Sequence, residues 1–243
     1  MSKYSGVLKV LRFNWPWYAG AVLVTIAVGA ALWFGLLADP WVACAGFGLA
    51  LADTWLLLSL VVSHVVYDRS AVARGGWLNG EVATTVAIFH LGQDEASAHA
   101  ARLLPTAHRQ TFDVFDSSCS GSPSLRRARA EAETFSTVAA HDQLPLADSS
   151  IELGLVIFAA HELRHAATRM AFFCELARII SPTGRVLVVE HLRDSWNLLA
   201  YGPGAFHFLA RRTWLQTFSQ AGLRVTQETA LTPWVRRFEL RRL

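Results

Sequence analysis

Two long apolar stretches dominate the first third of the chain. Phe13 to Leu37 carries no charged residue, and Pro40 to Tyr67 carries one acid, Asp53. Each stretch exceeds the roughly 20 residues that a helix needs to cross ~30 Å of hydrocarbon. A signal peptide has a shorter apolar core and is not followed at once by a second one. The pattern therefore predicts two transmembrane helices, at about 13–37 and 41–67.

Basic residues flank the outer ends of this pair: Lys3, Lys9 and Arg12 precede it, and Arg69 and Arg74 follow it. By the positive-inside rule both ends face the cytoplasm, which places the chain in the inner (cytoplasmic) membrane. Trp17, Trp33, Trp41 and Tyr67 fit aromatic belts at the two interfaces. The alternative is a buried helical hairpin of a soluble protein.

Asp53 lies in the middle of the second apolar stretch. A carboxylate facing lipid costs a few kcal/mol, so we expect Asp53 to face the partner helix, another subunit or a polar cavity. Gly46 and Gly48 allow close helix approach. Helix packing or a homo-oligomer contact through the transmembrane helices is favoured over a role in transport or catalysis.

Beyond a linker at 68–81, apolar runs with β-branched residues alternate with amphipathic segments over 82–243. Strands are predicted at about 82–89, 110–114, 135–140, 151–158, 185–189, 223–229 and 235–240, and helices through 104, over 125–133, between 159 and 181, and over 211–221. Alternation of this kind is typical of an α/β domain with a doubly wound, mostly parallel sheet.

Composition adds little to this picture. The 243 residues are 53% hydrophobic, with a net charge of +3 and three cysteines that lack CxxC spacing. We expect neither a disulfide nor a zinc-thiolate site. Arginines cluster at 126–129 and 236–242, which fits an anionic lipid surface or an ordinary solvated face. Nothing indicates nucleic-acid readout.

Three sequence motifs in the second part carry a family resemblance: Leu144-Pro145 to Ser150 before the fourth strand, Arg178 to Arg185 before the fifth, and Trp214 with Phe218 to Leu223 before the sixth. With the order of elements, they resemble the class I S-adenosylmethionine-dependent methyltransferases. The resemblance implies an α/β Rossmann-like methyltransferase fold with a reversed last strand, preceded here by two transmembrane helices. It also implies S-adenosylmethionine as cofactor.

The cofactor-binding positions of that family map onto six residues. The family's glycine-rich turn after the first strand corresponds to His90, Gly92 and Asp94, where one glycine of the motif is kept. Its ribose-binding acid corresponds to Asp113 or Asp116, and its adenine-side acid to Asp142.

Polar clusters follow two neighbouring strands, with His161 after the first and Glu190 and His191 after the second. In a parallel sheet these ends meet at the ligand-binding edge. His161 or His191 is suited to act as a general base oriented by Glu190, because the pKa of histidine lies near neutrality. An Arg-carboxylate network of Glu162, Arg164, Arg193 and Asp194 stays open as an alternative.

A metal site is a further alternative, with His161, Glu162, Glu190 and His191 as ligands. No HExxH spacing supports it, and we assign no metal ligand. The favoured prediction is a membrane-anchored methyltransferase, its domain facing the cytoplasm. Its acceptor would be a lipid, a quinone or another amphiphilic or membrane-associated molecule. The competing prediction is a non-catalytic binding or scaffold protein on a degenerate methyltransferase fold.

Overall fold

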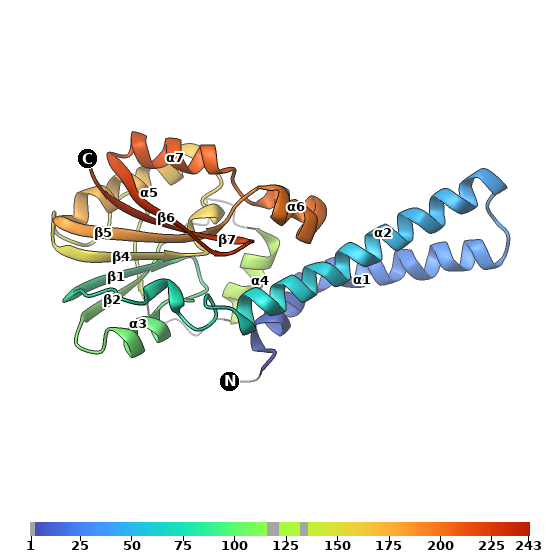
Figure 1. Ribbon diagram of the computed structural model, residues 1–243, viewed down its shortest axis with the longest axis horizontal. Coiled ribbons are helices and arrows are strands. Elements are labelled where there is room, and N and C mark those ends of the chain that lie inside the picture. The colour runs from blue at the N-terminus through green and yellow to red at the C-terminus, as the bar shows by residue number, and fades with distance from the viewer. Residues whose placement is uncertain (1–2, 116–121, 132–135) are drawn as a thin grey trace.

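The computed structural model describes residues 3–115, 122–131 and 136–243. A helical hairpin projects from one end of an α/β domain (Figure 1). The hairpin consists of α1 (Ser5–Trp33) and α2 (Asp39–His64). Both helices are long and apolar enough to cross a membrane, and their apolar windows are 0% and 17% buried. Their apolar surface is therefore not covered by the domain.

The hairpin follows from local sequence signals. Gly35, at φ 64°, ends α1 with a left-handed residue, and Pro40 occupies the first turn of α2, where no amide hydrogen is needed. The Asp53 carboxylate accepts a 3.0 Å hydrogen bond from Thr25 Oγ1, so it faces the partner helix as expected. The first helix begins earlier than predicted, at Ser5, because Asp68 accepts hydrogen bonds from the free amides of Gly6 and Val7.

The domain is built on a seven-stranded sheet in the order β3-β2-β1-β4-β5-β7-β6. The β1–β2, β1–β4, β2–β3 and β4–β5 pairs are parallel, and β7 is antiparallel to both β5 and β6. The strands are β1 (Thr85–His90), β2 (His108–Asp113), β3 (Thr137–Val138), β4 (Ile151–Ile157), β5 (Ile180–His191), β6 (Leu223–Thr232) and β7 (Val235–Arg242). This is the Rossmann-like methyltransferase fold with the reversed last strand that the sequence predicts.

Helices cover both faces of the sheet (Figure 1). They are α3 (Ser97–Leu103), α4 (Pro123–Glu131), α5 (Ala166–Ile179), α6 (Ser195–Tyr201) and α7 (Arg211–Gln220), with short helices η1 (Val65–Arg69), η2 (Gly76–Leu78), η3 (Ala160–Glu162) and η4 (Gly202–His207). One core contains Phe172, Phe173 and Trp214, and the other contains Trp77 and Leu78. The segment predicted as a linker thus buries two large side chains.

Three details differ from the sequence prediction. The strand β5 begins at Ile180 and passes through Ser-Pro-Thr-Gly, which forms an irregularity in its pairing with β4 instead of a separate turn. The described part of β3 has two residues. The pair α6 and η4 was not predicted, because their segment lacks a clear helical period. Asp194 starts α6 by accepting the amide hydrogen of Asn197 at 2.9 Å.

Replacement of Trp214 tests the core between α7 and the sheet. Its side chain is fully buried, stacks on Phe218 and meets the edge of Phe173. Trp214→Ala should lower the free energy of unfolding by about 3–5 kcal/mol. Trp214→Phe should cost less than Trp214→Ala, because the phenyl ring leaves a smaller cavity and, within the described chain, the indole Nε1 has no hydrogen-bond partner to lose. Urea unfolding of the two variants checks this, and equal losses would contradict it.

Candidate active site

The predicted cofactor positions around Gly92 and Asp113 lie at the carboxyl ends of β1 and β2, and the predicted catalytic residues lie at the carboxyl ends of β4 and β5. The strands β1 and β4 are neighbours in the sheet. The chain runs outward from β1 to β2 and β3, and then returns to β4 and β5. The junction between β1 and β4 is therefore the point where strand order reverses, and ligands of open α/β sheets bind at such a crevice. Gly92 follows β1 and His161 follows β4, so the fold brings the predicted cofactor and catalytic residues to one edge.

The loop after β1 satisfies its own backbone donors. Gly92 adopts φ 109° and donates its amide hydrogen to His90 Nδ1 at 2.9 Å. The imidazole is 3% exposed, and burial lowers its pKa despite the nearby acids Asp94 and Asp113. The Asp94 carboxylate accepts the amide hydrogens of Ala96 and Ser97 at the start of α3. These three residues shape a turn that a cofactor could approach, but their polar atoms are already paired.

Asp113 ends β2 and is 2% exposed. Its two carboxylate oxygens accept hydrogen bonds of 2.9 and 2.7 Å from Nη1 of Arg129 on α4. The same guanidinium lies 3.9 Å from the centre of the Phe115 ring. A Cβ at Gly92 would lie 2.2 Å from Arg129 Cγ. Arg129 therefore packs between the two positions at which the family resemblance places the cofactor.

A cavity of about 740 Å³ adjoins this loop. Its volume is within the range of small-molecule sites. The walls come from the end of β1 and its loop, from the first residue of α3, from β2, from α4, from the residue before β3 and from the first turns of α1: Ser5, Leu8, Lys9, Arg12, Phe13, His90, Gly92, Gln93, Asp94, Glu95, Ser97, Thr111, Ala128, Glu131 and Ser136. Two ion pairs, Lys9–Glu95 and Arg12–Glu131, tie α1 across it. The base of the hairpin thus forms one wall of the candidate cofactor pocket.

The two other predicted cofactor residues are less informative. Asp142 lies exposed in a turn closed by the bridge between Ala140 and Gln143. Asp116 lies outside the described residues. Their roles stay predictions.

His161 and Glu190 form a buried pair. Nδ1 of His161 donates to Glu190 Oε2 at 2.7 Å, and the His161 amide donates to Oε1 at 3.2 Å. Glu190 is 0% exposed. Burial alone would lower the pKa of His161, but the charge and hydrogen bond of Glu190 outweigh it and raise that pKa. Because Nδ1 carries the proton, the lone pair of Nε2 is directed away from Glu190 and can accept a proton.

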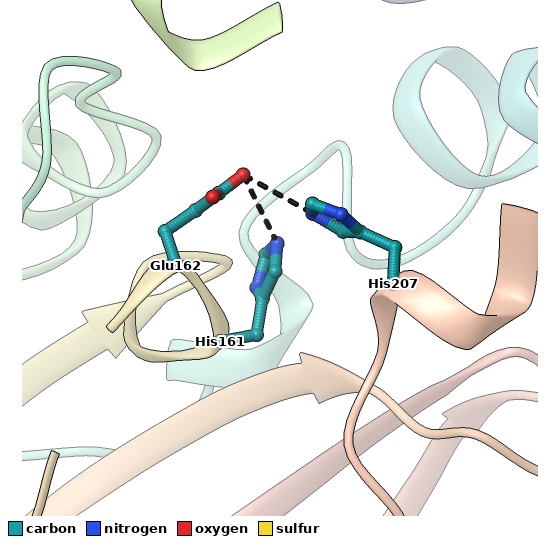
Figure 2. A group of neighbouring side chains, drawn as sticks. All are labelled: His161, Glu162 and His207. Carbon is teal, nitrogen blue, oxygen red and sulfur yellow. Dashed lines mark hydrogen bonds and ion pairs between the residues drawn. The ribbon is translucent and has the colours of Figure 1, made fainter. Parts of the chain in front are cut away.

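Glu162 and His207 complete the cluster around that nitrogen (Figure 2). His161 Nε2 lies 3.8 Å from Glu162 Oε1, and His207 Nε2 lies 3.1 Å from the same oxygen. These three residues offer donor atoms within 4.8 Å of one another, and two imidazoles with one carboxylate suit a transition metal. The Arg164 guanidinium, however, contacts His207 and lies 3.7 Å from Glu162. A fixed positive charge beside the donors opposes the binding of a metal cation.

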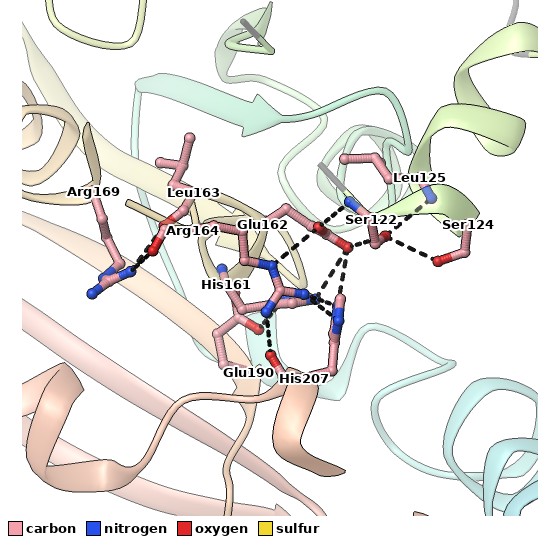
Figure 3. A network of polar contacts seen from close by, with 10 residues as sticks. All are labelled: Ser122, Ser124, Leu125, His161, Glu162, Leu163, Arg164, Arg169, Glu190 and His207. Atoms are coloured by element: carbon pink, nitrogen blue, oxygen red, sulfur yellow. Dashed lines mark hydrogen bonds and ion pairs between the residues drawn. The ribbon is translucent and has the colours of Figure 1, made fainter. Parts of the chain in front are cut away.

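Hydrogen bonds from the other side hold Glu162 in place (Figure 3). The amide and hydroxyl of Ser122 donate to its two oxygens at 3.0 and 2.7 Å. Burial opposes ionisation, but hydrogen bonds and nearby histidines lower the pKa of Glu162 well below its usual range. Burial lowers the pKa of His207. Of the predicted Arg-carboxylate network, the Glu162–Arg164 pair is formed, whereas Asp194 caps α6.

His191 is placed differently from His161. It is 1% exposed, and both of its ring nitrogens are engaged by protein groups. Tyr67 donates its hydroxyl hydrogen to Nε2 at 2.8 Å, and Nδ1 donates to the Trp234 carbonyl at 2.9 Å. The ring also stacks between Phe158 and Phe208. His191 therefore joins η1, the short helix that continues α2, to the sheet, and it does not share the cluster of His161, Glu162 and His207.

Several of these contacts are not visible in the sequence. From sequence, Arg129 belongs to an arginine cluster on a solvated or lipid-facing surface, and Tyr67 belongs to an interfacial aromatic belt. Arg129 is 16 residues from Asp113, and Tyr67 is 124 residues from His191. No local pattern signals such pairings. One signal in the sequence pointed to a partner for Asp113: this residue ends an apolar strand, and a carboxylate buried there requires a hydrogen-bond or charge partner.

Comparison with known proteins supports the fold. No family model matches the chain, and no curated protein sequence matches it. Mitomycin 7-O-methyltransferase MmcR superposes with a TM-score of 0.55 at 14% identity over 100% of this chain and 74% of its own. Geranyl diphosphate C-methyltransferase from Streptomyces coelicolor A3(2) gives 0.52 at 13% identity, covering 76% and 82%. The PH0226 protein from Pyrococcus horikoshii OT3 gives 0.52 at 11%, covering 72% and 88%. The chain therefore has a class I methyltransferase-like fold.

Acid titration tests the buried state of His191. Burial lowers its pKa from 6.5 to about 4. A group whose folded pKa is lowered is stabilising above its unfolded pKa, and that contribution is lost as pH falls from about 6.5 towards 4. The loss should be on the order of 3 kcal/mol. His191→Gln should be less stable than wild type at pH 7, and the gap should narrow by pH 4.5 in urea unfolding. A gap independent of pH would show that the folded pKa of His191 is not lowered.

Proposed function

We propose that the protein is a membrane-anchored S-adenosylmethionine-dependent methyltransferase acting on a lipid, a quinone or another membrane-associated acceptor. The observation that carries the proposal is the pair of His161 and Glu190 at the carboxyl ends of β4 and β5, where β4 is the neighbour of β1 in the sheet. Similarity of fold to MmcR and to geranyl diphosphate C-methyltransferase, whose structure contains S-adenosylhomocysteine, supports the reaction class.

The residues at β1 and β2 are suited to hold the cofactor, with one condition. Gly92 would allow the amino acid part of the cofactor to approach the backbone closely, and Asp113 would accept hydrogen bonds from the ribose hydroxyls of the cofactor. S-adenosylmethionine, when bound, supplies an electrophilic methyl group. Because Arg129 occupies the Asp113 carboxylate, its side chain must turn away for the ribose to bind.

His161 would act as the general base. Its Nε2 accepts the proton of an acceptor hydroxyl or amine, while Glu190 holds Nδ1–H and stabilises the imidazolium that forms. Glu162 and His207 line the same space and would orient the acceptor by hydrogen bonds. His191 supports this arrangement through packing, because both of its nitrogens are already engaged.

The apolar hairpin supports membrane anchorage. Both helices leave their apolar surface uncovered, and Lys9, Arg12 and Arg69 lie at the domain end. These charges favour a cytoplasmic position for the domain in an inner membrane.

A scaffold without catalytic activity is the second candidate. The specific observation that favours it is the ion pair between Arg129 and Asp113, which fills the ribose position.

Replacement of the base tests the enzyme proposal. His161→Gln should lower methyl transfer from labelled S-adenosylmethionine to a membrane lipid extract by roughly 100- to 10,000-fold, because glutamine cannot accept the proton. Gln can still donate to Glu190, so thermal unfolding should change little. His165→Gln, at an exposed position four residues away, is the matched control. Full activity of His161→Gln would remove the catalytic assignment.

The Glu190→Gln variant separates positioning from packing. Without the carboxylate the pKa of His161 should fall, so that the rise of kcat/KM with pH moves to lower pH. A lowered rate with an unmoved pH profile would instead indicate a structural role.

Replacement of Arg129 distinguishes the enzyme from the scaffold. If the cofactor must displace this side chain, Arg129→Ala should tighten binding of S-adenosylhomocysteine about tenfold, equivalent to ~1.4 kcal/mol. Arg126→Ala, exposed on the same helix, is the control and should leave affinity unchanged. Calorimetry of the purified full-length protein measures both. Absence of binding in wild type and in Arg129→Ala would favour the scaffold, and weaker binding in the variant would make Arg129 a ligand contact.

A further inference from the structure

Exposed apolar side chains in the domain are concentrated in one segment. Beyond residue 69, the described part of the chain exposes seven large apolar side chains, and four of them lie in α6 and η4: Trp196 (54%), Leu198 (36%), Leu199 (59%) and Phe206 (66%). The same helix buries Asn197 and Ala200 against the domain. The segment therefore has one face that belongs to the fold and one apolar face without a covering element.

This segment is attached to the hairpin. Trp55, on α2, donates its indole hydrogen to the Leu199 carbonyl at 3.0 Å. A Cβ on Gly202 would lie 3.1 Å from the Trp55 ring, so the turn after α6 is fitted closely to α2. Figure 1 shows α6 beside α2 at the end of the domain from which the hairpin projects. The segment that carries this apolar face therefore lies beside the hairpin, in contact with Trp55.

The length of α2 determines the depth at which the contact between Trp55 and α6 would lie in a bilayer. From Trp41, near the distal loop, to Trp55 the helix rises about 21 Å at ~1.5 Å per residue. A bilayer core is ~30 Å thick. With Trp41 at the distal interface, Trp55 lies about 9 Å inside the proximal edge of the hydrocarbon. The segment that packs on Trp55 is therefore held at the proximal boundary layer, where amphipathic segments bury their apolar faces about 5–10 Å deep.

We propose that α6 and η4 form a second membrane-contact surface, which inserts Trp196, Leu199 and Phe206 into the bilayer interface. This inference rests on the proposed membrane anchorage and deepens it. Phe206 directly precedes His207, whose Nε2 is 3.1 Å from Glu162 in the candidate active site. The surface would place that site at the lipid boundary. The acceptor would then be an amphiphile whose hydroxyl or amine reaches His161 while its chain remains in the bilayer.

Fluorescent labels at three exposed positions test the proposal. Single cysteines replace Leu199, Phe47 and Leu243 in the full chain, with the three native cysteines changed to alanine, and each carries an environment-sensitive dye. Phe47 is 73% exposed on the hairpin, and Leu243 is 78% exposed at the C-terminus, which lies at the end of the domain away from the hairpin (Figure 1). The proteins are reconstituted in phosphatidylcholine vesicles with or without brominated acyl chains. Each variant is used only if its thermal unfolding matches the parent.

Quenching of the labels at 47 and 199, but not at 243, is the expected result. Quenching at 47 alone would overturn the surface proposed for α6 and η4 and leave the anchorage intact. Absence of quenching at both 47 and 199 would overturn the anchorage together with this inference. Quenching at all three positions would also overturn the inference, because it would reflect general adsorption of the domain. Phe206→Ser in the Leu199 label background should reduce the quenching at 199 severalfold, whereas Val138→Ser, at an exposed site outside the segment, should not.

Discussion

The buried carboxylate of Glu190 is the interaction on which the site depends. Removing a charge from water is costly unless hydrogen bonds compensate it. Here both compensating donors belong to His161, which follows a different strand. The carboxyl ends of β4 and β5 must therefore stay in register, and one tautomer of His161 is fixed. The same pair that stabilises the strand ends directs Nε2 towards Glu162 and His207.

A second buried carboxylate, Asp113, is compensated in another way. Its partner Arg129 comes from α4, a helix that also contacts the base of α1 through the Phe13 carbonyl and Arg127. Occupation of Asp113 by a side chain and by a ribose would be mutually exclusive. The positions of α4 and α1 thus determine how much free energy a ligand must supply to displace Arg129 from Asp113 and bind at the end of β1. Because residues of α1 form one wall of the pocket, the position of the hairpin is coupled to that free-energy cost.

The fold was predictable from sequence because its signals are local. The buried strand Val86 to Phe89 and the amphipathic helix ending before Gly222 are recognisable from hydrophobic period and turn residues alone. The edge of the sheet at which the polar residues gather was predictable too, because the carboxyl ends of parallel strands meet at one edge. Which side chains meet there was not. His161 and His191 look equivalent in sequence, yet one pairs with Glu190 and the other binds Tyr67 and Trp234. That difference depends on side-chain direction at the strand end and on contacts across more than 40 residues.

The hairpin and the site are linked by geometry as well as by sequence order. Tyr67 continues α2 into the domain and bonds to His191, and Trp55 holds α6 from the same helix. Two contacts about three helical turns apart fix the domain against the hairpin. Under the proposed membrane anchorage, this fixed orientation turns the carboxyl ends of β1 and β4 towards the bilayer. An acceptor that diffuses within the lipid plane would then meet the site without leaving the bilayer.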